Sequence, residues 1–153
     1  MKRFMAVTLV ALLATALPAA AQPVFGARAG LTANPDQIHF GAHAKVLEMA
    51  PGLLFLPNIE IGLGDDAMLL TFNAEFTYTF SEAQWRRWHP YAGGGVGVNV
   101  SEPDSADSST DVGLNALIGV SKVLNIGHEF FAELKLGLED SPDLKLTLGF
   151  SFF

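Results

Sequence analysis

The chain has 153 residues, a mass of 16.3 kDa and a formal net charge of −7, a size typical of one domain. Half of its residues are hydrophobic and only 16% are charged, which excludes a disordered or collagen-like chain. The acidic balance disfavours nucleic acid as a partner, and the lack of cysteine excludes disulfides, thiol catalysis and cysteine-ligated zinc.

The first 21 residues have the layout of a cleaved signal peptide. Lys2 and Arg3 form a basic start, residues 4–17 carry no charge, and residues 19–21 are three alanines. The uncharged run of 14 residues is shorter than the roughly 20 that a helical membrane span requires. We therefore predict export, cleavage before Gln22 and a mature chain of one domain, residues 22–153.

From residue 24 onward, hydrophobic residues recur at every second position, which is typical of β-strands. Turn-forming Gly, Pro, Asn and Asp residues separate the alternating segments. Pro57 removes one backbone donor, so the third strand could begin only at Asn58. The predicted strands are residues 24–33, 37–47, 54–64, 67–80, 89–101, 111–123, 128–139 and 143–153.

The two faces of these strands differ sharply. One face, from Phe25 to Phe152 and including Val46, carries no charge, whereas the other combines charged and polar residues with many glycines. The predicted interior polar cluster is Arg28, His39, His43, Lys45, Glu60, Glu75, Glu129, Glu133, Lys135 and Lys145. A soluble lipocalin-like barrel would turn the apolar face inward, and a membrane barrel would turn it toward lipid. The glycines favour the membrane barrel, because long charged side chains fit inside a narrow barrel only where their neighbours are small. The predicted fold is all-β, an eight-stranded antiparallel up-and-down transmembrane β-barrel.

The turns predict the orientation of this barrel. If the N-terminus starts in the periplasm, every aspartate lies in or beside an outward turn. The favoured interpretation of these carboxylates is a rim that keeps the loops solvated, and the alternative is a weak site for Ca²⁺ or Mg²⁺. The candidate cation rim is Asp65, Asp66, Asp104, Asp107, Asp140 and Asp143. Aromatic residues at the opposite end predict an interfacial girdle. Its candidates are Phe80, Trp85, Trp88, Tyr91, Phe130 and Phe152.

The segment 88–98, in which a Pro90-Tyr91 step leads into a glycine-alternating strand, and the ending 148–153 resemble the small OmpA/OmpX-like family of Gram-negative outer-membrane barrels. The resemblance covers the whole mature chain and implies residence in the outer membrane as a monomer. It implies contact with membrane lipid, lipopolysaccharide and the barrel-insertion machinery, for which terminal Phe153 would be the insertion signal. Phe152, however, and not Phe153, is in phase with the apolar face.

No residue pattern predicts catalysis or a cofactor. The glycine run 93–97 lies within a strand and does not open a helix, as a nucleotide-binding loop would. His39 and His43 share one strand face at roughly 13 Å, too far apart to bind one metal ion. Some outer-membrane barrels deacylate lipopolysaccharide with His and Ser two positions apart on a strand, a spacing that no histidine here shows.

The interior charges leave two functions open. Eight strands enclose only enough space for side chains, so we expect a plugged interior and a structural or interaction role in the cell envelope. The alternatives are limited passage of a small solute and, third, a secreted soluble ligand-binding barrel.

Overall fold

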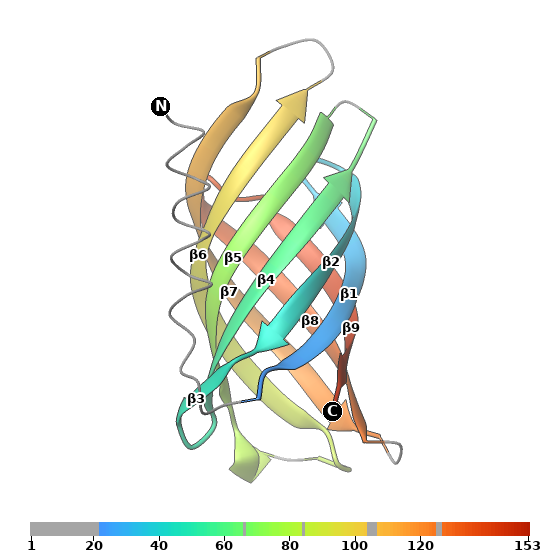
Figure 1. The fold of residues 1–153 in the computed structure, drawn as a ribbon, viewed down its shortest axis with the longest axis vertical. Coiled ribbons are helices and arrows are strands. Elements are labelled where there is room, and N and C mark those ends of the chain that lie inside the picture. The colour runs from blue at the N-terminus through green and yellow to red at the C-terminus, as the bar shows by residue number, and fades with distance from the viewer. Residues whose placement is uncertain (1–21, 66, 84, 104–106, 125–126) are drawn as a thin grey trace.

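A computed structural model describes residues 22–65, 67–83, 85–103, 107–124 and 127–153 (Figure 1). The predicted signal peptide, residues 1–21, lies outside the described residues, as do Asp66 and Asp104. Within the described part of the chain, no helix is long and hydrophobic enough to span a membrane.

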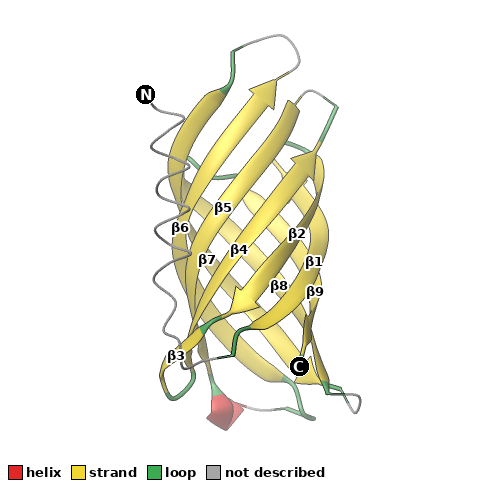
Figure 2. Cartoon of the chain, in the orientation of Figure 1, coloured by secondary structure: helices red, strands yellow, loops and turns green. Residues whose placement is uncertain are grey.

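Antiparallel strands form almost the entire described structure, with one short 3-10 helix, η1 (Ser81–Ala83) (Figure 2). The strands are β1 (Val24–Ala33), β2 (Gln37–Lys45), β3 (Leu47–Ala50), β4 (Leu53–Leu63), β5 (Ala67–Thr79), β6 (His89–Pro103), β7 (Ser109–Val123), β8 (His128–Glu139) and β9 (Leu144–Phe152). Each strand from β3 to β8 pairs with its successor, β1 pairs with both β2 and β9, and β2 pairs with β4. The sheet is therefore closed on itself, and β3 continues the wall of β2, which gives the predicted eight-stranded barrel.

The second predicted strand, residues 37–47, is interrupted in the structure. Pairing between β2 and β4 stops at His43 and Asn58, and resumes between β3 and β4 at Leu47 and Phe55. From His43 to Leu47 the chain advances four residues, whereas the opposite strand advances only three, from Asn58 to Phe55. The β2–β3 side therefore contains one extra residue, a β-bulge. A bulge inverts the alternation of side chains. Val46, predicted to face lipid, is consequently buried at 6% exposure.

The prediction that Pro57 delays the start of the third strand is wrong. β4 begins at Leu53 and pairs with β5 without interruption through Pro57, which lies opposite Ala74. Its other neighbour is the bulged region, where the ladder to β2 is already broken. A residue without a backbone N–H is tolerated at such a position.

The alternation of the strands sorts side chains by environment. Along β9, Lys145, Thr147, Gly149 and Ser151 are buried, whereas the residues that alternate with them are exposed. The same holds around the barrel, where the exposed large side chains are mainly Leu, Ile, Val and Phe. The apolar face therefore points outward and the polar face inward. This arrangement contradicts the soluble lipocalin-like alternative, in which the apolar face would line the interior.

The two ends of the barrel are named here by their residues. The tryptophan end holds the start of β1, the end of β9 and the connection 80–88 between β5 and β6. The aspartate end holds the connections β1–β2, β4–β5, β6–β7 and β8–β9.

Candidate functional site

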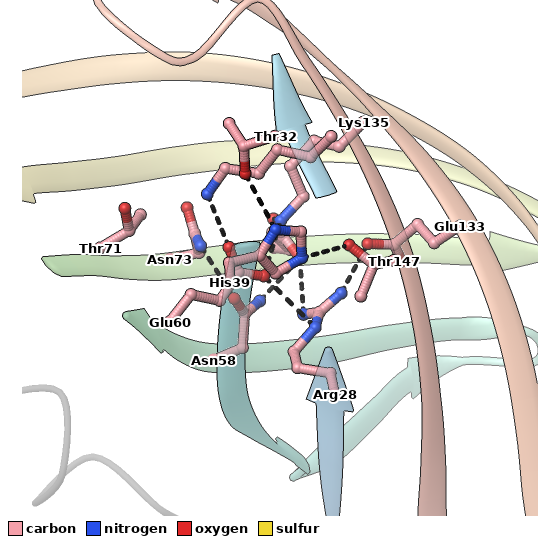
Figure 3. A network of polar contacts seen from close by, with 12 residues as sticks. Arg28, Thr32, His39, Asn58, Glu60, Thr71, Asn73, Glu133, Lys135 and Thr147 are labelled. Atoms are coloured by element: carbon pink, nitrogen blue, oxygen red, sulfur yellow. Dashed lines mark hydrogen bonds and ion pairs between the residues drawn. The ribbon is translucent and has the colours of Figure 1, made fainter. Parts of the chain in front are cut away.

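The centre of the barrel contains a network of buried ions, here called the central network (Figure 3). Its cations are Arg28 of β1, Lys135 of β8 and Lys145 of β9, and its carboxylates are Glu60 of β4, Glu75 of β5 and Glu133 of β8. All six residues are at most 4% exposed. Three positive and three negative groups balance, as burial of ions in a low-dielectric interior requires.

The ion pairs join strands that are not neighbours in the wall of the barrel. Arg28 Nη2 lies 2.6 Å from Glu133 Oε1, and Arg28 Nε lies 3.3 Å from Glu60 Oε1. Lys145 Nζ donates to Glu60 Oε2 at 2.7 Å, and Lys135 Nζ lies 2.5 Å from Glu75 Oε1. The network therefore links β1, β4, β5, β8 and β9 through the barrel interior, and not only through the wall.

Neutral side chains complete the network. Asn58 Nδ2 donates to Glu75 Oε2 at 2.8 Å, and Asn73 Nδ2 donates to Asn58 Oδ1 at 2.8 Å. Tyr91 donates its hydroxyl proton to Glu133 Oε2 at 3.0 Å. The placement of Tyr91 in the aromatic girdle was therefore wrong. It is in phase with Gly93 and Gly95 on the inward face of β6, because every second residue of a strand shares one face.

The two interior histidines lie on β2, and their side chains reach across β1 to β9, where the barrel closes. His39 Nε2 lies 3.0 Å from Thr147 Oγ1 and His39 Nδ1 lies 2.9 Å from Thr32 Oγ1, while His43 Nε2 lies 2.9 Å from Ser151 Oγ. Each ring reaches from β2 over β1 to β9, and β1 presents Gly30 and Gly26 at the crossing points. The sequence search for His and Ser on one strand missed these pairs, because the partners are on different strands. Ser151 and Thr147 share the face of Lys145, which is the signal that could have identified them.

A cavity of about 230 Å³ lies between the central network and the tryptophan end. Arg28, His43, Tyr91 and Glu133 line it, and Lys45 and Glu129 form an ion pair at its side. That pair is more exposed than the central network, at 16% and 15% of the side-chain surface. All ten residues of the predicted interior cluster thus point into the barrel, six of them in the central network.

The remaining girdle candidates lie at the tryptophan end. The Trp88 ring packs edge-on against Phe130 at a centroid distance of 6.1 Å, and Phe130 packs against Phe150 at 5.2 Å. Phe80, Trp85 and Phe152 are exposed by 43%, 66% and 51%. Three further outward aromatics near this end, which the sequence analysis did not select, are Phe55, Phe76 and Tyr78.

The candidate insertion signal, Phe153, and the described aspartates of the candidate cation rim are all exposed. Phe153 follows the end of β9 and is 63% exposed, with Lys45 Nζ 5.7 Å from its ring centroid. Asp65, Asp107, Asp140 and Asp143 are exposed at the aspartate end. Among the described residues, no three His, Asp or Glu side chains are close enough to hold a metal ion.

Comparisons with known proteins identify the fold. No protein family and no curated protein matches the sequence. Among solved structures, Neisserial surface protein A, NspA, is 17% identical with a TM-score of 0.65, over 84% of this chain and 94% of that one. The Yersinia pestis outer membrane protein Ail, solved in a phospholipid bilayer nanodisc, is 11% identical with a TM-score of 0.53, over 86% of this chain and 99% of that one. The outer membrane enzyme PagL is 15% identical with a TM-score of 0.51, over 86% of this chain and 99% of that one. The chain therefore has the closed eight-stranded barrel fold of these small outer-membrane proteins, the fold that the resemblance to the OmpA/OmpX-like family implied.

Proposed function

We propose that this protein is an integral outer-membrane β-barrel with a plugged polar interior and a non-catalytic, structural or interaction role in the bacterial cell envelope. The observation that carries the proposal is the combination of an exposed apolar outer surface with a charge-balanced ion network at the centre of the barrel. In water, the exposed Leu, Ile and Phe side chains would form an unusually large apolar surface. In a bilayer, they are the surface that a membrane barrel requires.

The central network supports a plug because its members bridge the lumen. Lys145 of β9 pairs with Glu60 of β4, and Lys135 of β8 pairs with Glu75 of β5, in each case past two intervening strands of the wall. Leu69, Leu117 and Phe131, which are also inward-facing, are buried at 7% or less and fill space between the polar groups. An eight-stranded barrel has little interior volume beyond its side chains.

Single-cysteine probes test the membrane orientation, and the natural chain provides a background without cysteine. Spin labels at Leu134→Cys and Leu146→Cys should report a hydrocarbon environment in phospholipid vesicles, with high accessibility to oxygen and low accessibility to a water-soluble nickel reagent. Val112→Cys, near the start of β7 at the aspartate end and 65% exposed, is the matched outward control and should be more accessible to nickel. Wetted labels at positions 134 and 146, or a chain that stays folded and dissolved without detergent, would contradict the proposal.

The cavity favours limited passage of a small solute as a second candidate function. Its volume of about 230 Å³ would hold several water molecules or one small polar molecule. Passage additionally requires that the central network open toward the aspartate end. Conductance measurements, described in the Discussion, distinguish this candidate from the plug.

A further inference from the structure

The connection between β5 and β6 ends in a tight turn, Trp85-Arg86-Arg87-Trp88, with an unusual backbone. Trp88 N donates to Trp85 O at 2.8 Å, and Trp85 N donates to Trp88 O at 3.1 Å. Between them, Arg86 and Arg87 both have positive φ, 47° and 71°. These values correspond to a two-residue type I′ turn, which strongly favours Asn-Gly because side chains other than Gly, Asn and Asp are strained there.

Two consecutive arginines therefore adopt a backbone conformation that is unfavourable for arginine. Backbone strain of this kind points to a function of the side chains concerned. Both arginines are exposed, and Arg86 Cζ lies 5.3 Å from the centroid of the Trp85 ring.

Lys122 extends this basic site from the neighbouring wall. It lies at the end of β7, next to the buried Ser121 and therefore on the outward face, with its Nζ 5.4 Å from the Trp88 ring centroid. The basic residues after position 21 are Arg28, Lys45, Arg86, Arg87, Lys122, Lys135 and Lys145. Four of them point into the barrel and form the ion pairs found among the described residues. The other three all lie at the tryptophan end, although the chain as a whole is acidic.

We propose that Arg86, Arg87 and Lys122 bind the phosphate of an anionic glycerophospholipid headgroup, with Trp85 and Trp88 placed at the same interfacial depth. This inference rests on the proposed membrane insertion and adds a ligand to it. Tryptophan rings favour the headgroup region of a bilayer, and arginine binds phosphate through two parallel hydrogen bonds. Because the described residues contain no carboxylate paired with these three cations, their charge is available to the lipid.

The chain offers an internal reporter for this site. Trp85 and Trp88 are its two tryptophans, so the whole tryptophan fluorescence arises here. The protein is folded into phosphatidylcholine vesicles that contain a small fraction of brominated phosphatidylglycerol or, in parallel, the same fraction of brominated phosphatidylcholine. We expect the brominated anionic lipid to be enriched near the tryptophans about fivefold or more, since one Lys or Arg near an anionic surface contributes on the order of 1 kcal/mol.

The matched variant is Arg86→Asn/Arg87→Gly, with and without Lys122→Gln. Asn-Gly is the preferred sequence of a type I′ turn, so the hairpin should form at least as well and the thermal midpoint should not fall. The anionic enrichment should nevertheless drop toward 1 in the triple variant, whereas Arg86→Lys/Arg87→Lys should retain most of it. This separates the site from any effect on folding.

Equal quenching by the two brominated lipids in the natural protein would overturn the proposal, and so would unchanged enrichment in the triple variant. Enrichment that is abolished by 10 mM inorganic phosphate at constant ionic strength would also overturn it, because the site would then be assigned to free phosphate. Heat-modifiable gel migration in pure phosphatidylcholine reports insertion independently. A chain that inserts but shows no anionic preference would contradict this inference alone, and one that does not insert would contradict the proposed function.

Discussion

At the scale of single residues, Glu60 pairs with all three cations of the central network, just as Arg28 pairs with all three carboxylates. Its carboxylate lies 3.3 Å from Arg28 Nε, 2.7 Å from Lys145 Nζ and 3.7 Å from Lys135 Nζ. It is 1% exposed, so no solvent replaces these contacts when its charge is removed. The network has six members, and loss of this carboxylate leaves three cations with two anions.

We therefore expect Glu60→Gln to lower the free energy of unfolding by about 3 kcal/mol or more, the usual cost of removing one partner of a buried ion pair. Glu129→Gln is the matched control. It removes the partner of Lys45 from the more exposed pair and should cost about 1 kcal/mol or less. Urea titrations in phospholipid vesicles, followed by tryptophan fluorescence, measure both. Equal losses of unfolding free energy in the two variants would show that burial does not determine how much these ion pairs stabilise the barrel.

The sequence predicted on which face of its strand each of these residues lies, but not with which residue it pairs. Alternation alone placed Glu60, Glu75 and Lys145 inside, because a period of two determines the side of a strand without any knowledge of its neighbours. Pairing depends on strand register and on barrel stagger, which alternation does not contain. Tyr91 shows the opposite error: its residue type suggested an interfacial position, and its phase in the strand, which is the stronger constraint, was not applied.

At the scale of elements, the closure between β1 and β9 depends on glycine. A Cβ added to Gly30 would collide with the carbonyl oxygen of Leu146 and come within 2.9 Å of the His39 ring. The glycine therefore provides the space through which His39 reaches Thr147 of β9. Gly26 provides the same space for His43 and Ser151.

We expect Gly30→Ala to destabilise the barrel by about 1–3 kcal/mol, the usual cost of overpacking, and to weaken its closing strand pair. The temperature at which the compact gel band converts to the unfolded band should fall accordingly. Ala29→Val, one residue away and facing outward, is the control and should leave this temperature nearly unchanged. Thr147→Val tests the hydrogen bond alone and should cost about 1 kcal/mol. If Gly30→Ala and Ala29→Val behave alike, the space above β1 is not what closure requires.

Element boundaries were accessible from the sequence except at the bulge. Turn residues such as Asn34 and Pro35 and the alternation itself located most strand ends to within a few residues of the observed bounds. The extra residue between β2 and β3 was not accessible, because it is defined only by comparison with the opposite strand β4. Pro57 was the available signal, and the correct interpretation was a broken ladder on one side and not the start of a strand.

At the scale of the whole molecule, the charges divide into three zones. A balanced network occupies the centre, exposed aspartates lie at one end, and the three outward basic residues lie at the other. The cavity of about 230 Å³ lies on the tryptophan side of the central network, and Arg28 and Glu133 form its boundary toward the centre. An ion that entered this cavity would therefore meet paired and hydrogen-bonded side chains, and not an aqueous path.

We accordingly predict that the natural protein, inserted into planar bilayers, carries no steady open current. The double substitution Glu60→Ala/Lys145→Ala removes a bonded pair together, keeps the interior neutral and creates space in the network, so it should introduce a small, measurable conductance. Glu129→Ala/Lys45→Ala is the control, because it enlarges only the cavity side of the lumen and should leave the bilayer silent. A stable current through the natural protein would favour solute passage over the plug, since the central ion pairs would then not obstruct the lumen that they bridge.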